Sequence, residues 1–161
     1  MRRVLTNVKL RYASGANQLR NKPMTADSSR PAAVRRNDSE LTIVQEIATS
    51  GADRPLLMMN LNRYKPEAGF PDGALYKAYR TALTKVLPNV GGKILWESAV
   101  QGQMVGEQPI HEILAVWYPS HQAFLDLPTV QDADENFRLR GQAVEYAVIH
   151  RCDGEIAPLA G

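Results

Sequence analysis

The chain has 161 residues, of which 44% are hydrophobic and 22% are charged. This balance excludes a chain that is disordered throughout, and the length fits one domain with an appendage. No apolar run reaches the roughly 18 residues of a membrane-spanning helix, so no membrane contact is expected. The single cysteine excludes an internal disulfide and favours a reducing compartment, the cytoplasm.

The excess of positive over negative charge lies at the beginning of the chain. Residues 1–36 contain nine Lys or Arg residues and one acid, a net charge of +8, whereas the other 125 residues contain ten bases and sixteen acids, a net charge of −6. A body with this negative charge repels phosphate backbones, so nucleic-acid binding is not expected. Residues 1–37 also lack apolar periodicity, which predicts a flexible basic N-terminal tail before a single domain over residues 38–161.

Three interpretations of the tail are open. It is a basic arm for an acidic partner, an arginine-containing targeting segment, or an extension upstream of a start at Met24. Basic tails are commonly no more than solvated chain, which argues against the arm. The tail has no secretory apolar region, so export is not expected.

The first elements of the domain are a short helix and a strand. Asp38 or Ser39 is a candidate N-cap for the helix, which ends at Gly51. Residues 56–64 are rich in Leu and Met and are typical of a buried strand. Residues 65–73 contain the Pro and Gly of a loop.

The clearest helix follows, because apolar residues recur at i, i+4, i+7, i+8 and i+11 within residues 75–87. Residues 93–106 predict a long strand and residues 110–118 a third one, and the short turn between them favours an antiparallel hairpin. A second helical region begins at residue 121 and is broken by Pro128, and a further helix extends through Arg140 and ends at Gly141. Residues 143–151 predict the fourth strand.

The order β-α-β-β-α-β predicts an α+β, ferredoxin-like antiparallel sheet with an additional N-terminal helix. Right-handed crossovers place both crossover helices on one face of the sheet. The strands are nevertheless apolar on both faces, since Leu57 and Met59 alternate with Met58, and Trp96 alternates with Leu95. The face without helices needs a second layer, and a second copy of the sheet is its simplest source. The sequence therefore predicts a homodimer.

Several segments are distinctive in their order and spacing. They are the strand around Asn60, the glycine pair and tryptophan of Gly91–Trp96, and the junction Tyr118-Pro119-Ser120. Residues 54–150 resemble a small bacterial family of unknown function in the dimeric α+β barrel superfamily. The resemblance implies a ferredoxin-like fold and a homodimer. The wider superfamily includes cofactor-independent monooxygenases, isomerases, haem-handling enzymes and binding domains, and a shared fold does not select among them.

The chain departs from the pattern of this family at three positions. His111 and Trp117 stand where the family usually has an acid. Phe137 stands where a histidine commonly precedes the arginine that matches Arg138. If those polar groups form the site of the family, this chain has altered or lost that chemistry.

Three residues are candidates for catalysis: Asn60, Glu112 and His111. Asn60 lies in mid-strand, where its amide either orients a ligand carbonyl or bonds to a neighbouring backbone. His111 and Glu112 are adjacent on a strand and point to opposite faces, so they cannot act as a dyad. His111 is either a general base or a solvated histidine. Glu112 and Glu97 would form an acid–base pair if they share an apolar cavity, unless each pairs with a nearby base.

The candidates for ligand binding are aromatic and basic side chains: Arg63, Tyr76, Trp96, Trp117 and Arg138. Arginine can clamp a carboxylate through two hydrogen bonds, and aromatic side chains line pockets for hydrophobic ligands. The simpler interpretations are a surface ion pair for Arg63, a base at a helix C-terminus for Arg138, and core or dimer interface for the aromatic residues.

The sequence contains no metal-ligand cluster, phosphate loop or dinucleotide motif, so neither a metal nor a cofactor is expected. Two functions remain open. The first is a small-molecule-binding or cofactor-independent enzyme-like protein that performs proton transfer or oxygenation on a hydrophobic carbonyl compound or binds a carboxylate ligand. The second is a non-catalytic dimeric structural or binding module with a basic arm. A pocket with Asn60 and a carboxylate would favour the first, and a filled interior the second.

Overall fold

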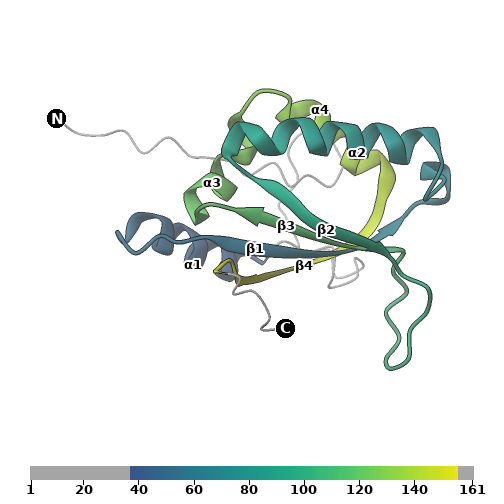
Figure 1. Cartoon of the computed structure of the whole chain (residues 1–161), viewed down its shortest axis with the longest axis horizontal. Coiled ribbons are helices and arrows are strands. Elements are labelled where there is room, and N and C mark those ends of the chain that lie inside the picture. Colours follow the sequence, from purple (N-terminus) through teal and green to yellow (C-terminus); the bar gives the residue numbers. More distant parts are fainter. Residues whose placement is uncertain (1–36, 156–161) are drawn as a thin grey trace, which may run out of the picture.

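The computed structural model describes residues 37–155, so residues 1–36, which hold nearly all of the expected tail, lie outside the described part, as do residues 156–161. The described chain is an α+β fold with one four-stranded sheet and four α-helices (Figure 1). The strands are β1 (Leu56–Tyr64), β2 (Lys93–Ala99), β3 (Glu112–Tyr118) and β4 (Val144–Asp153). The α-helices are α1 (Asp38–Thr49), α2 (Ala74–Val86), α3 (His121–Asp126) and α4 (Ala133–Ala143). Short 3-10 helices are η2 (Pro66–Ala68), η3 (Leu87–Val90) and η4 (Leu127–Thr129).

The sheet has the strand order β2-β3-β1-β4, and all neighbouring strands are antiparallel. Met58 of the central strand β1 lies opposite Val116 of β3 on one side and Arg151 of β4 on the other. The outer strands β2 and β4 each follow a helical connection. The expected α+β class, the four-stranded antiparallel sheet and the hairpin of β2 and β3 are confirmed.

Helices cover one face of this sheet. α2 and α4 pack against each other above it (Figure 1). Because side chains alternate along a strand, the buried Leu56 and Met58 of β1 face the helices together with Leu114 and Val116 of β3. These residues share the core with Val86 of α2, which is fully buried. No helix among residues 37–155 is long and apolar enough to cross a bilayer.

The opposite face of the sheet is apolar and half-buried. Alternate positions of three strands supply its side chains, which are Leu57, Met59, Leu61, Ile113, Trp117 and Val148. None of these six belongs to the core of the described residues or packs against it. Trp96 of β2 lies on the same face and is 48% exposed. We call these seven residues the apolar sheet face. Apolar surface of this extent is typical of a face that another layer covers.

One expected strand is shorter in the structure. The strand expected over residues 93–106 ends at Ala99, and residues 100–111 form a loop instead. Gly106 in this loop has a φ of 85°, a backbone conformation that side chains disfavour. The side chain of Gln103 forms hydrogen bonds within the loop, to the carbonyl of Val105 and from the N–H of Gln108. The backbone therefore turns where an extended strand was expected.

Two helix boundaries also differ from those expected. α4 continues past Gly141 to Ala143, because the side chain of Lys65 donates a hydrogen bond to the Gly141 carbonyl at 2.8 Å and its backbone N–H donates to the Ala143 carbonyl at 2.9 Å. These bonds satisfy carbonyls that the last turn of a helix leaves unpaired. α1 is capped by Asn37, one residue before the expected position, and the Asn37 side chain accepts a hydrogen bond from the N–H of Glu40 at 3.1 Å.

A buried histidine joins α3 to the linker that precedes β1. Nδ1 of His121 lies 2.9 Å from Oδ1 of Asp53 and 3.1 Å from the carbonyl oxygen of Arg54. Both oxygens are acceptors, so Nδ1 carries the proton. The backbone N–H groups of His121 and Gln122 also donate to the Asp53 carboxylate, at 2.7 and 3.1 Å. Burial opposes ionisation, but these hydrogen bonds outweigh it and lower the pKa of Asp53 below its usual value.

We expect Asp53→Asn to destabilise the protein in a pH-dependent way. A carboxyl group with a lowered pKa in the folded state adds stability above its unfolded pKa, and this stability is lost as the pH falls through the folded pKa. The free energy of unfolding should therefore drop by about 1 to 2 kcal/mol near neutral pH and by less in acid. Urea unfolding at neutral pH and in acid measures the effect, with the Asp72→Asn variant, at an exposed position, as the control. A loss that does not vary with pH would contradict the assignment.

Candidate functional site

A buried carboxylate lies at the start of β3. Glu112 is 2% exposed and lies opposite Asn62 of β1 and Ala99 of β2. Strand alternation directs its side chain, like that of Leu114, toward the helices. A carboxylate in this position needs hydrogen-bond donors, because the loss of water is otherwise costly. Two tyrosine hydroxyls supply them: that of Tyr64 lies 2.5 Å from Oε2 and that of Tyr76 lies 2.7 Å from Oε1.

Local structure explains why the two tyrosines meet at Glu112. Tyr64 ends β1 and faces the same side as Asn62, two residues earlier. Tyr76 lies in the first turn of α2, which Gly73 begins. A Cβ atom at Gly73 would lie 2.2 Å from the Ala68 carbonyl oxygen, so only glycine permits this tight approach of α2 to the preceding loop. The turn thus carries Tyr76 over the end of the sheet.

Aromatic rings surround this carboxylate. Phe70 stacks on Tyr64 with ring centroids 5.2 Å apart, and it forms a T-shaped pair with Tyr76 at 5.0 Å. The ring of His111 is also parallel to that of Phe70, at 5.6 Å, and lies 6.4 Å from the ring of Tyr64. Nδ1 of His111 accepts a hydrogen bond from the backbone N–H of Tyr64 at 3.0 Å, so the proton of the neutral ring lies on Nε2. We call Glu112 and these four rings, those of Tyr64, Phe70, Tyr76 and His111, the Glu112 cluster.

Both tyrosine hydroxyls remain protonated at physiological pH. Burial raises the pKa of Tyr64, and the neighbouring Tyr79 and Glu112 raise it further. Burial also raises the pKa of Tyr76, and the hydrogen bond to Glu112 adds to the effect. Each tyrosine is therefore a hydrogen-bond donor to the carboxylate, and neither is a tyrosinate.

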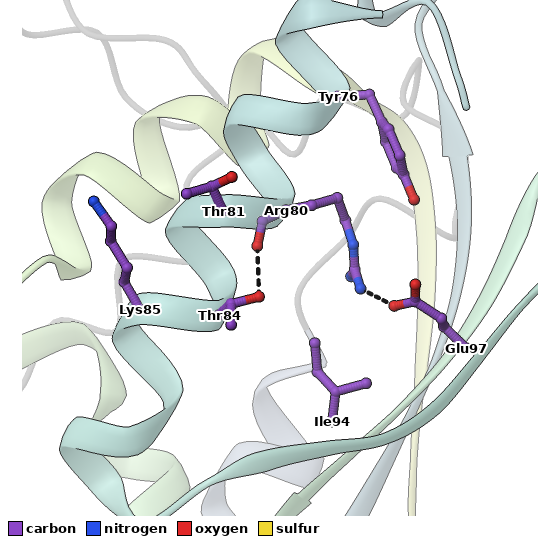
Figure 2. A pocket seen from close by; sticks show the side chains of 7 residues that line it. All are labelled: Tyr76, Arg80, Thr81, Thr84, Lys85, Ile94 and Glu97. Carbon is purple, nitrogen blue, oxygen red and sulfur yellow. Dashed lines mark hydrogen bonds and ion pairs between the residues drawn. The ribbon is translucent and has the colours of Figure 1, made fainter. Parts of the chain in front are cut away.

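A groove of about 530 Å³ lies between α2 and β2 and borders this cluster. Its lining residues are Tyr76, Arg80, Thr81, Thr84, Lys85, Ile94 and Glu97. Figure 2 shows Arg80 reaching across from α2 to Glu97 of β2, with the Tyr76 hydroxyl on the same side of the groove. Tyr76 is thus shared: it lines the groove and donates its hydroxyl to the buried carboxylate.

Arg80 is the principal charge of the groove. Its side chain is 13% exposed and forms an ion pair with Glu97, which is 51% exposed. Nη1 of Arg80 is buried and has no hydrogen-bond partner within residues 37–155. Burial opposes the charge of the guanidinium, but the carboxylates of Glu112 and Glu97 outweigh this and raise the pKa of Arg80. Arg80 therefore stays cationic, and its Nη1 is a buried donor that no acceptor of the described residues satisfies.

A second, much smaller cavity lies between the sheet and the helices. It measures about 30 Å³ and includes Asn60, Asn136 and Arg140 among mainly apolar residues. Nδ2 of Asn60 donates to the carbonyl of Met58 at 3.0 Å. A space of this volume holds about one water molecule. The region around Asn60 is accordingly close to a filled interior.

The structure brings together some of the residues that the sequence singled out. Glu112 and Tyr76 are bonded directly, and His111 contacts Tyr64 of the same cluster. Glu97 faces the same side as Glu112, as considered from the sequence, but its partner is Arg80.

The other candidate residues lie elsewhere. Asn60 lines the small cavity, and Arg63 pairs with Glu145 at 3.1 Å. Trp96 and Trp117 belong to the apolar sheet face. Arg138 is exposed on α4 and bonds to Glu135 at 2.7 Å. The structure thus divides the candidates between the groove, the interior and the surface.

Sequence reasoning missed two residues of the site: Tyr64, which bonds to Glu112, and Arg80, which lines the groove. Both carried a signal in their spacing. Tyr64 follows Asn62 by two residues on a recognised strand and must share its face. Arg80 follows Tyr76 by four residues on a recognised helix and must lie beside it. Among residues 37–155, no group of three or more His, Cys, Asp or Glu side chains could hold a metal ion.

Comparison with known proteins identifies a fold without a function. No family model and no curated protein matches the chain. A solved structure of a protein of unknown function from Rhodopseudomonas palustris is similar, with a TM-score of 0.61 and 23% identity over 77% of this chain and 97% of that one. The methylated form of that protein gives a TM-score of 0.60 and 24% identity over 78% of this chain and 94% of that one. At this identity the likeness establishes the fold alone.

We expect Tyr64→Phe to lower the free energy of unfolding by about 1 to 2 kcal/mol, because it leaves the buried carboxylate with one donor fewer. Chemical denaturation measures the loss. The matched control is Tyr146→Phe, which removes a half-buried hydroxyl that accepts a hydrogen bond from Gln108 at 3.1 Å. The Tyr146 variant should lose less stability. Equal losses would show that the fold does not depend on the hydrogen bonds to Glu112.

Proposed function

We propose that the protein binds a small hydrophobic carbonyl or carboxylate compound in the groove between α2 and β2, and that Tyr76 and Glu112 transfer a proton there. The observation that carries this proposal is the double role of Tyr76, which lines the groove and donates its hydroxyl to a carboxylate that is 2% exposed. A buried carboxylate connected to a ligand groove is typical of acid–base chemistry.

The proposed assembly is a homodimer of ferredoxin-like domains, of the dimeric α+β barrel type. The strand order β2-β3-β1-β4, with helical connections before β2 and β4, supports the split β-α-β arrangement. The apolar sheet face supports the second copy, since this surface lies opposite the helices. The exposed free thiol of Cys152 agrees with the cytoplasmic location proposed from the sequence.

In the proposed reaction, a proton leaves the carbon next to the carbonyl group of the ligand. The electron pair of the broken C–H bond moves onto the carbonyl oxygen. The proton bonds to the Tyr76 oxygen as the Tyr76 proton passes to Glu112, along the 2.7 Å hydrogen bond between them. Oxygenation would begin with the same step and would need dioxygen as a co-reactant.

Arg80 would stabilise the negative charge that forms on the ligand. Its guanidinium lines the groove, stays cationic and has one donor atom, Nη1, without a partner in the described chain. A fixed cation near a developing oxyanion lowers the barrier more than a solvated one, because little reorganisation is needed. The same group would bind a ligand carboxylate. The open lining around Ile94 would contact the apolar part of the compound.

The proposal predicts separate effects on binding and on proton transfer. Carbonyl and carboxylate compounds are screened by thermal shift against the wild type, and exchange of the proton next to the carbonyl of each bound compound is followed by NMR in heavy water. Glu112→Gln should retain binding and slow the exchange by about 100-fold or more. Arg80→Gln should weaken binding by about tenfold or more.

Lys77→Ala, at an exposed position of the same helix, is the matched control and should change neither quantity. A wild type that binds none of the compounds, or an exchange rate in Glu112→Gln equal to that of the wild type, would overturn the proposed chemistry.

A non-catalytic dimeric module is the second candidate function. It is favoured by the interior around Asn60, where the cavity measures about 30 Å³ and the amide bonds to its own strand. Both candidate functions assume the dimer, and they differ in whether the groove carries out chemistry on a ligand. Turnover or exchange at the groove supports the first, and an inert groove in a stable dimer supports the second.

We expect the protein to have the mass of two chains in light scattering at micromolar concentration. Trp96→Glu should shift the mass toward one chain, because burying a carboxylate on the apolar sheet face is costly when no opposite charge compensates it. Gln122→Glu, at an exposed position on α3, should leave the mass unchanged. A wild type with the mass of one chain would refute the dimer.

A further inference from the structure

The loop of residues 100–111 presents apolar side chains to solvent. It connects β2 to β3, and Met104 and Val105 near its tip are 98% and 88% exposed. Figure 1 shows the loop extending far beyond the end of the sheet. Two adjacent apolar residues at the tip of a long loop are unfavourable in water, and loops of this length are commonly functional.

Hydrogen bonds hold this loop in shape. The backbone N–H of Val100 donates to the carbonyl of His111 at 2.8 Å and closes the base of the loop. Gln103 bridges the tip, because its side chain donates to the Val105 carbonyl at 3.1 Å and accepts from the N–H of Gln108 at 2.7 Å. The side chain of Gln108 donates in turn to the Tyr146 hydroxyl of β4 at 3.1 Å. The exposed apolar tip is therefore a built feature of the fold.

The loop projects on the side of the sheet away from α2 and α4 (Figure 1). The apolar sheet face lies on that same side, because its side chains alternate with those that face the helices. A chain that packs against this face would consequently lie within reach of the loop tip.

The loop would enlarge the apolar surface that the sheet face offers to a second copy. The pairing of β1 and β3 extends over seven positions. At about 3.4 Å per residue and about 4.8 Å per strand, a four-stranded face of this length has a flat area of about 450 Å². A stable dimer buries roughly 800 Å² on each partner. Side chains that stand out from the sheet add accessible surface to this flat area, and a loop laid over the partner would add further apolar contact.

We infer that the loop of residues 100–111 is a dimerisation arm, and that Met104 and Val105 of each chain pack against the second copy. The inference rests on the proposed homodimer. In a two-fold dimer the contact occurs twice, because each chain is both donor and acceptor of an arm. The arm thus counts double in the free energy of association.

The test compares dimer dissociation constants by analytical ultracentrifugation. The double variant Met104→Ser with Val105→Ser should weaken the dimer by about tenfold or more, because each dimer loses both apolar tips. The matched control is Gln101→Ser, also exposed in the loop, which should leave the dissociation constant unchanged. Both variants alter exposed side chains, so their unfolding midpoints at concentrations where the wild type is monomeric should equal that of the wild type.

A second readout locates the contact directly. A photo-reactive benzophenone amino acid at position 104 should form cross-links between an isotope-labelled and an unlabelled chain. A dimer with an unchanged dissociation constant in the double variant and no cross-link between chains would overturn the arm and leave the dimer standing. A wild type that stays monomeric would overturn both, and cross-links solely within one chain would also refute the arm.

Discussion

The hydrogen bonds from two tyrosine hydroxyls to Glu112 are the constraint on which the site depends. A carboxylate that is 2% exposed has lost its water and is tolerated when donors replace that water. The donors come from the end of β1 and the first turn of α2, so their bonds fix both elements against the start of β3. The position of the groove beside Tyr76 follows from this arrangement.

Arg80 and a second carboxylate, that of Glu97, determine the electrostatics around Glu112. Arg80 lies between an exposed acid, Glu97, and a buried one, Glu112, and both hold its guanidinium in the charged form against the effect of burial. The ion pair with Glu97 also connects α2 to the outer strand β2. A single arginine therefore contributes both to the packing of a helix on the sheet edge and to the electrostatics of the groove.

The sequence predicted the elements better than the contacts between them. The strand of residues 56–64 was predicted with its observed boundaries, because its apolar run is flanked by clear turn residues. Glu112 and Tyr76 were recognised as candidates, but their direct bond depends on how α2 crosses the sheet. Local spacing could have placed Tyr64 and Arg80 on the correct faces. The partner of Arg80 depends on the register of β2, which shifts between Ile94 and Trp96 and cannot be read from periodicity.

That shift has a consequence for how chains can associate. β2 is an outer strand of the sheet, and an unbroken outer strand offers a row of free N–H and C=O groups to which further strands can add without limit. An irregular strand twists locally and interrupts such a row. The ammonium of Lys93, which lies 4.9 Å from the ring centroid of Trp117, adds a charge at the beginning of the same strand. Lateral, fibre-like growth of the sheet through β2 is thereby disfavoured.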